Sequence, residues 1–303
     1  MDKLKAMSML IKVTEVGSFS AASKNLNIPL STLSRKISEL EDEIGVRLLH
    51  RTTRKLTLTT AGAKYINTYI RILEQAEEAD RKVRGEYSDP RGDLLLTAPI
   101  MFGRMYVIPI VTEFLALYRN INVQLLLSDG NINLFEDDVD MAIRIDHLPD
   151  SSMIATQVGE IRMITCANEQ VLTHDKKIES PADITNFPCI LFNTVKLMKH
   201  WTYRQPSSNK EIQINITPRL TVNDSESAVM AAINGIGLTQ QLHYQVKDAL
   251  DKRKLKIILP EFEPNKIPVH VIHKSKKYMP QKMKSFLDYA VPKLKEKIQE
   301  LQL

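Results

Sequence analysis

The segment PLSTLSRKISELEDEIG, residues 29–45, combines a stripe of apolar side chains with a face of short hydroxyl side chains. On a wheel of roughly 100° per residue, the stripe lies within about 40° of its first member and consists of Leu33, Ile37, Leu40 and Ile44. The opposite side carries Ser31, Arg35 and Ser38, flanked by Thr32, Ser34 and Lys36. This pattern predicts a helix that has Pro29 at its first position, ends at Gly45 and buries its stripe against another helix.

Serine and threonine form helices poorly because their side chains compete for backbone hydrogen bonds. Beside Arg35 and Lys36, however, their short side chains would let the helix backbone approach DNA closely. The second half of the helix is acidic, with Glu39, Glu41, Asp42 and Glu43, and a polyanion would repel it. We therefore expect only the first half to enter a DNA groove. The alternative is that these residues form an ordinary solvated face.

The flanking segments complete a small basic domain. An apolar helix over Met1–Val16 ends at Gly17, Ser18 is expected to cap a short helix, and VRLLHRTTRKLTLT alternates as a β-hairpin does. Residues 1–60 hold 10 Lys+Arg against 6 Asp+Glu, so most of the net charge of +5 lies here. This arrangement favours double-stranded DNA as a partner. The candidate DNA contacts are Ser18, Ser20, Leu30, Ser31, Thr32, Ser34, Arg35, Lys36, Arg51, Arg54 and Lys55.

A long helix is predicted from Thr60, which would cap it. Its apolar residues recur at roughly heptad spacing: Ala63, Ile66, Ile70, Leu73, Ala76 and Val83. Because a lone helix with this stripe exposed would be unstable, we expect it to pair with a second copy of itself. GEYSDPRGD, residues 85–93, reads as a linker. The expected domains are therefore 1–60, a dimerisation helix over 61–88, and 89–303.

Beyond the linker, segments typical of strands and helices alternate. DLLLTAP, INVQLLLSD, VDMAIRI, RMITCA, CILF and VHVIH read as strands, while GRMYVIPIVTEFLALY, NINLFEDD, PADITNF, SESAVMAAINGIG and the segment from Pro280 read as helical. Such alternation predicts α/β lobes with parallel sheets. The length favours two lobes, which we place at 91–161 with 267–303, and at 162–266.

The segment GSFSAASKNLNIPLSTLSRKISELEDEIGVRLLHRTTRKLTLTTAG resembles the winged helix-turn-helix of LysR-type transcriptional regulators in order and spacing. YVIPIVTEFLALYRNINVQLLLSDGNINLFEDDVDMAIRI and PADITNFPCILF resemble the effector domain of the same family. The resemblance implies a two-lobed, periplasmic-binding-protein-like α/β domain that binds a small-molecule effector. It also implies a homotetramer (a dimer of dimers) on promoter DNA, possible contact with RNA polymerase, and a cytoplasmic, nucleoid-associated location. Many members have a polar residue at Leu30, which could instead contact a thymine methyl.

Ligands of doubly wound sheets bind beyond the carboxyl ends of the strands. The expected effector site accordingly comprises Ile100, Met101, Phe102, Ser128, Arg144, Asn193, Thr194 and Asn223. Family members often have a hydroxyl residue at Met101, whereas methionine packs on apolar and aromatic surfaces. We therefore expect an apolar or aromatic effector, with any acidic group held away from Met101. Arg144 either forms an ion pair with Asp140 or Asp146, or binds an anionic effector.

The sequence offers little evidence for a catalytic or metal-binding site. Two cysteines are too few for a thiolate zinc site, His270 and His273 lie on opposite faces of one predicted strand, and NGIGL reads as a turn and not as a dinucleotide site. We expect no enzyme activity, cofactor, metal or membrane span. A transporter's solute-binding protein would need a secretion signal, and an architectural DNA protein would not need the α/β lobes, so both rival classes are disfavoured.

Overall fold

The computed structural model describes residues 2–51, 56–83, 89–130, 139–148, 153–172, 177–192, 199–274 and 279–301. The chain forms two compact units, Met1–Gly92 and Asp93–Leu303. Several expectations lie outside the described residues: the wing turn with Arg54 and Lys55, the helix predicted at 131–138, and Asn193 and Thr194. The side chain of Arg51 is likewise outside the described part.

The N-terminal unit contains α1 (Lys3–Val16), α2 (Phe19–Leu26), α3 (Leu30–Ile44), β1 (Leu49–Arg51), β2 (Leu56–Leu58) and α4 (Thr60–Val83). Gly17 and Gly45 end α1 and α3 in the left-handed conformation, as predicted. The buried core joins Met7, Leu10 and Val13 of α1 to the stripe of α3, whose Leu33, Ile37 and Leu40 are fully buried. The predicted packing of these two helices is confirmed.

The predicted first residue of α3 and the predicted cap of α4 are each wrong by one residue, whereas α4 begins at Thr60 as predicted. Pro29 has an extended backbone and precedes α3, which begins at Leu30. The hydroxyl of Thr59, and not that of Thr60, accepts the N–H of Gly62 at 2.8 Å and caps α4. The strands β1 and β2 pair antiparallel, with Leu49 opposite Leu58, which confirms the hairpin.

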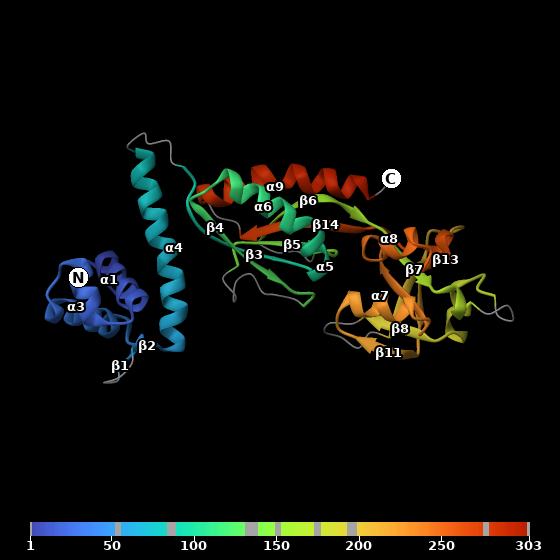
Figure 1. Cartoon of the computed structure of the whole chain (residues 1–303), viewed down its shortest axis with the longest axis horizontal. Coiled ribbons are helices and arrows are strands. Elements are labelled where there is room, and N and C mark those ends of the chain that lie inside the picture. The colour runs from blue at the N-terminus through green and yellow to red at the C-terminus, as the bar shows by residue number, and fades with distance from the viewer. Residues whose placement is uncertain are drawn as a thin grey trace. The chain divides into compact units, whose positions relative to one another are not determined.

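The first lobe of the C-terminal unit has a five-stranded sheet in the order β4-β3-β5-β14-β6. Its elements are β3 (Gly92–Ala98), α5 (Ile100–Phe102), a π-helical turn (Gly103–Val107), α6 (Ile108–Leu117), β4 (Ile121–Leu127), β5 (Met141–Ile145), β6 (Met153–Ile161), β14 (Ile267–Lys274) and α9 (Gln281–Glu300). In Figure 1, α6 and α9 lie side by side on one face of this sheet. Phe114 of α6 packs on Phe286 of α9, with ring centroids 5.1 Å apart, and Glu113 accepts bonds from Tyr289 and Lys293.

The second lobe has a sheet in the order β11-β8-β12-β7-β13. Its elements are β7 (Met163–Ala167), β8 (Cys189–Phe192), β9 (His200–Arg204), β10 (Glu211–Asn215), β11 (Pro218–Val222), α7 (Ser225–Ile233), β12 (Leu238–Leu242), α8 (His243–Asp251) and β13 (Lys256–Ile258), with 3-10 turns at Glu169–Val171, Pro181–Asn186 and Pro260–Phe262. Residues 234–237 form the turn between α7 and β12, as predicted for this segment.

The prediction of purely parallel sheets is wrong, because both sheets are mixed. β3 and β5 are parallel, but β14 runs antiparallel to its neighbours β5 and β6. The reason is that the chain leaves the first lobe after β6 and returns to it as β14, in the opposite direction. In the second lobe β8 is parallel to β11 and β12, whereas β7 is antiparallel to β12 and β13.

One described helical stretch, Ile100–Leu117, is long and apolar enough to cross a membrane by length and composition, although we expect no membrane span from the sequence. In the first lobe it is a core element. Phe102, Val107, Ile110 and Phe114 from this stretch are buried in the main hydrophobic cluster with residues of the sheet and α9. Other apolar residues of the stretch, Met105, Ile108 and Leu117, are exposed.

Candidate nucleic-acid interface and effector site

The first half of α3 presents the polar face expected from the sequence. Leu30 is 46% exposed, Ser31 and Arg35 are exposed, and Thr32, Ser34 and Lys36 are half-buried at the flanks. Ser31 and Arg35 lie on the far side of the helix from Leu33, Ile37 and Leu40, which the unit's core fixes in place. The helix therefore holds a cation and short hydroxyls toward solvent on a rigid support.

The acidic half of α3, which we expect to stay out of a DNA groove, is partly paired with the cations of the first half and partly buried. Glu39 lies 3.7 Å from Arg35 Nε and 3.1 Å from Lys36 Nζ, so it pairs with both cations of the first half. Exposed pairs of this kind contribute little free energy, and phosphate groups can replace them. Glu41 is 2% exposed and lies inside the unit. Only Asp42 and Glu43 are exposed, with Glu43 3.4 Å from Lys3.

The remaining candidate DNA contacts occupy α2 and the wing. Ser18 is half-buried, and its hydroxyl caps α2 by accepting the N–H of Ala21 at 3.4 Å, as predicted. Ser20 is exposed in the first turn of α2. The backbone of Arg51 pairs with Leu56 at the end of β1, so this residue leads into the wing turn.

The first-lobe residues of the expected effector site lie at the carboxyl ends of the neighbouring strands β3, β4 and β5. The N–H of Ile100 donates to Asp129 Oδ1 at 2.9 Å, and the hydroxyl of Ser128 accepts the N–H of Gly130 at 3.1 Å. Arg144 is half-buried, with Nη1 3.4 Å from the carbonyl oxygen of Gly130. Burial lowers the pKa of Arg144, which remains protonated at pH 7. Asp140 and Asp146, its candidate ion-pair partners, accept the N–H groups of Leu95 and His147.

Phe102 does not line an open cleft, and its assignment to the effector site is corrected. Its side chain is 0% exposed because the helical stretch begins at Ile100, which turns position 102 toward the core. The ring packs on Tyr106, at 4.9 Å between centroids, and edge-on against Tyr244 of α8 at 5.6 Å. Phe102 thus belongs to an aromatic cluster that joins the two lobes. Met101, one residue earlier, is half-buried.

Near these strand ends, carboxylates of the protein itself accept the N–H groups at the start of the helical stretch at Ile100 and at the start of α7. Asp129 Oδ1 binds the first turn at Ile100, and Asp224 caps α7 by accepting the N–H of Ser227 at 2.8 Å. Burial raises the pKa of Asp129, and its Oδ2 is buried without a hydrogen-bond partner. Arg104 reaches across to α7 and pairs with Glu226 at 2.8 Å. Asn223, at the start of this region, is exposed.

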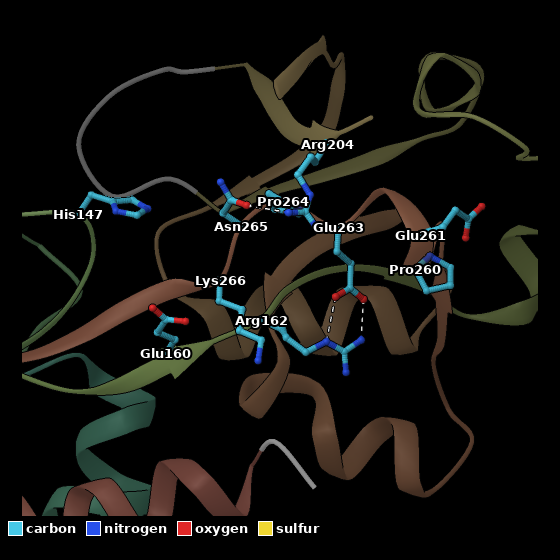
Figure 2. Close-up of a pocket in the computed structure, with 10 residues that line it drawn as sticks. All are labelled: His147, Glu160, Arg162, Arg204, Pro260, Glu261, Glu263, Pro264, Asn265 and Lys266. Carbon is cyan, nitrogen blue, oxygen red and sulfur yellow. Dashed lines mark hydrogen bonds and ion pairs between the residues drawn. The ribbon is translucent and has the colours of Figure 1, made fainter. Parts of the chain in front are cut away.

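A cavity of about 580 Å³ lies where the chain crosses between the lobes (Figure 2). It is lined by His147, Glu160, Arg162, Arg204, Pro260, Glu261, Glu263, Pro264, Asn265 and Lys266. Arg162 follows β6 and Glu263 precedes β14, and the two form a bidentate pair at 2.9 and 2.6 Å. Glu263 raises the pKa of Arg162. We missed this pair in the sequence, since 101 residues separate its members and neither belongs to a motif.

The described residues offer little nucleophilic or metal-binding chemistry. Cys166 and Cys189 are buried, and burial raises the pKa of each thiol to about 12, so neither is a reactive thiolate at pH 7. Among the described residues, no group of three or more His, Cys, Asp or Glu side chains could hold a metal ion.

Both units match one family. Residues 4–63 match the bacterial regulatory helix-turn-helix domain of the lysR family, and residues 88–295 match the LysR substrate binding domain. A helix-turn-helix transcriptional repressor of Pseudomonas aeruginosa (strain UCBPP-PA14) is 30% identical over 291 residues, which is 96% of this chain and 92% of that protein. The transcriptional activator AaeR of Escherichia coli (strain K12) is 28% identical over 297 residues, 96% of this chain and 95% of that protein.

Solved structures give the same result. CrgA, a LysR-type transcriptional regulator from Neisseria meningitidis, is 27% identical with a TM-score of 0.60, covering 96% of this chain and 98% of that chain. The full-length Vibrio cholerae virulence activator AphB is 25% identical with a TM-score of 0.60, covering 96% of this chain and 99% of that chain. From these matches over both units, the chain belongs to the LysR family of DNA-binding transcriptional regulators.

Proposed function

We propose that this regulator binds promoter DNA with the first half of α3 and the β1–β2 wing. The observation that supports the proposal is the exposed face of Ser31 and Arg35 opposite a fully buried stripe. A rigid helix that carries short donors and one long cation can bring its backbone close to base edges. The wing cations Arg51, Arg54 and Lys55 would add contacts to the phosphate backbone, which orient the protein without reading sequence.

Replacing Arg35 with alanine should weaken specific promoter binding by about 1–3 kcal/mol, the free energy of one specific base contact. Fluorescence anisotropy at fixed salt measures this loss. Lys3→Ala is the matched control, because it also removes one exposed cation of the N-terminal unit, where Lys3 pairs with Glu43. An affinity for promoter DNA that is equal in Arg35→Ala and in Lys3→Ala would remove Arg35 from the interface.

The C-terminal unit is proposed to bind a small apolar or aromatic effector beside Met101, Ser128 and Arg144. The carboxylate of Asp129 at the first turn supports the idea that an acidic effector group lies away from Met101, because the two negative charges would repel each other. Arg144 lies near the carboxyl end of β5, and its guanidinium group can bind the acidic group of an effector. Asn193, Thr194 and Asn223 are proposed to close the site from the second lobe.

Calorimetric titration of aromatic and aliphatic acids into the wild type and Met101→Ser tests the effector class. We expect aromatic acids to bind the wild type, and the serine variant to lose roughly 1 kcal/mol of that affinity with the loss of the thioether contact. Met105→Ser, at a position 45% exposed on the same helical stretch, is the control. Tight binding of small polar acids to the wild type, with no aromatic ligand, would contradict the proposal.

Self-association is proposed to use α4. Ile66 and Ile70, in the first half of its stripe, pack on the unit's own core, but Val83 at the far end is 90% exposed. The 1–88 fragment should therefore sediment as a dimer at micromolar concentration, and Val83→Lys should weaken the dimer because it places a charge on the stripe. A stable monomer of the wild-type fragment would exclude this stripe as the interface.

As a DNA-binding regulator, the protein is proposed to act in the cytoplasm, where its DNA target lies, and to catalyse no reaction. Assembly of two dimers into a tetramer on two promoter sites, association with the nucleoid, and contact with RNA polymerase are parts of the proposal that rest on family resemblance alone.

A further inference from the structure

Glu41 is a buried carboxylate on the helix that we propose enters DNA. It is 2% exposed and lies roughly 80° around the helical wheel from Leu33, at the border of the apolar stripe. An ionised side chain is costly to bury unless hydrogen bonds compensate for the lost water. Its partners therefore indicate what the residue does.

The carboxylate of Glu41 binds the strand that leads into the wing. Oε1 accepts the backbone N–H of Leu48 at 2.8 Å and that of Leu49 at 3.1 Å, and Oε2 accepts Arg47 Nη1 at 3.1 Å. Leu49 is the first residue of β1, so two charge-assisted bonds fix the start of the wing to α3.

The other side of the same strand is held by the start of α4. The N–H of Thr59 donates to the carbonyl oxygen of Leu48 at 3.0 Å, and its hydroxyl donates to that of Arg47 at 2.8 Å. Gly62 lies so close that a Cβ there would be 2.0 Å from the oxygen of Leu48. The segment 47–49 is thus clamped between α3 and α4.

We propose that Glu41 is a positioning residue for DNA binding, which acts by setting the wing at a fixed place relative to the first half of α3. The proposal rests on the proposed use of both elements in DNA binding. Because Glu41 is buried, it touches no DNA itself. Its effect passes through the backbone of residues 48 and 49 to β1 and Arg51.

The direction in which DNA affinity changes distinguishes a positioning role of Glu41 from the general effect of a negative charge. Removing a negative charge from a DNA-binding surface should strengthen DNA binding, since repulsion of the phosphates falls. Glu39→Gln, at a half-buried position on the side of the same helix that carries Arg35 and Lys36, should behave in this way. Glu41→Gln removes the same charge, yet should weaken binding about threefold to tenfold, because a neutral amide oxygen accepts the two N–H groups more weakly than a carboxylate oxygen, and the amide NH2 group cannot accept the bond from Arg47.

The experiment measures promoter binding by the full-length protein for the wild type, Glu39→Gln, Glu41→Gln, Arg51→Ala and the double variant Glu41→Gln/Arg51→Ala over a series of salt concentrations. If Glu41 acts through the wing, Arg51→Ala should cost less affinity in the Glu41→Gln background than in the wild type. The slope of affinity against salt should also become shallower in Glu41→Gln, as phosphate contacts are lost.

Unchanged or tighter binding by Glu41→Gln, or strictly additive effects of the two substitutions, would overturn the proposal. Circular dichroism at the assay temperature tests folding. Should Glu41→Gln not fold, Glu41→Asp keeps the charge but shortens its reach, and must show the same weakening and the same coupling to Arg51. Loss of binding in Arg35→Ala but not in Glu41→Gln would leave the DNA-binding assignment intact and refute only the positioning role.

Discussion

Replacing Phe102 with alanine should lower the free energy of unfolding of the C-terminal unit by about 3–5 kcal/mol. The side chain is 0% exposed and packs between Tyr106 and Tyr244, so its removal leaves a cavity that rigid neighbours fill only in part. Tyr244 belongs to α8 of the second lobe, and the cavity would therefore also loosen the packing of one lobe on the other.

Urea titration followed by the fluorescence of Trp201 measures this loss, because Trp201 is the chain's single tryptophan and is buried in the second lobe. Met105→Ala, at an exposed position three residues later, should change the free energy of unfolding by no more than about 0.5 kcal/mol. A similarly small effect for Phe102→Ala would mean that its ring is not held in the core, and would restore it as a candidate effector contact.

Leu33→Ala should lower the free energy of unfolding of the N-terminal unit by about 2–5 kcal/mol. Leu33 is 0% exposed at the centre of the contact between α1 and α3. A unit of this size has a total stability of the same order, so the variant should be largely unfolded near 37 °C and should lose DNA binding as a consequence. Thermal circular dichroism of the 1–88 fragment measures the change.

Leu30→Ala is the matched control on the same helix, since Leu30 is 46% exposed. It should leave the melting temperature nearly unchanged while it alters promoter affinity, because Leu30 is a candidate DNA contact whose apolar side chain suits a thymine methyl. If both leucine variants lost stability equally, the division of α3 into a buried stripe and a DNA-facing side would be wrong.

Periodicity predicted α3 well because its stripe has four apolar members, and three of them are fully buried. The same method counted Glu41 among the acidic side chains that would repel DNA, since charge suggests exposure. Its position on the wheel, close to the stripe, was the signal that could have corrected this. The partners that make burial possible are backbone N–H groups of residues 48 and 49, which no side-chain pattern reveals.

In the C-terminal unit, the sequence predicted the strands β3, β4, β5, β7, β8 and β14 but missed β6 and β9 to β13, and the prediction that the strands run parallel was wrong. Whether β14 runs parallel or antiparallel to β5 depends on how the chain returns from the second lobe, and local sequence carries no record of this. For the same reason the Arg162–Glu263 pair was missed. Phe102 was placed in the cleft because it follows a strand, whereas the helix that begins at Ile100 turns it into the core. Both this error and the one at Pro29 concern the residue at which a helix begins, which the sequence pattern does not define closely enough.

The first lobe is built from both ends of its unit: β14 lies between β5 and β6, and α9 covers the sheet. During synthesis, the N-terminal unit is complete once α4 has left the ribosome, but this lobe must wait for almost the whole chain. A product terminated before Ile267 would leave β5 with an unpaired edge and β6 without its sheet neighbour, and unpaired edges recruit strands from other chains. Premature termination should therefore yield an aggregating product, and not a shortened regulator that binds its promoters without control.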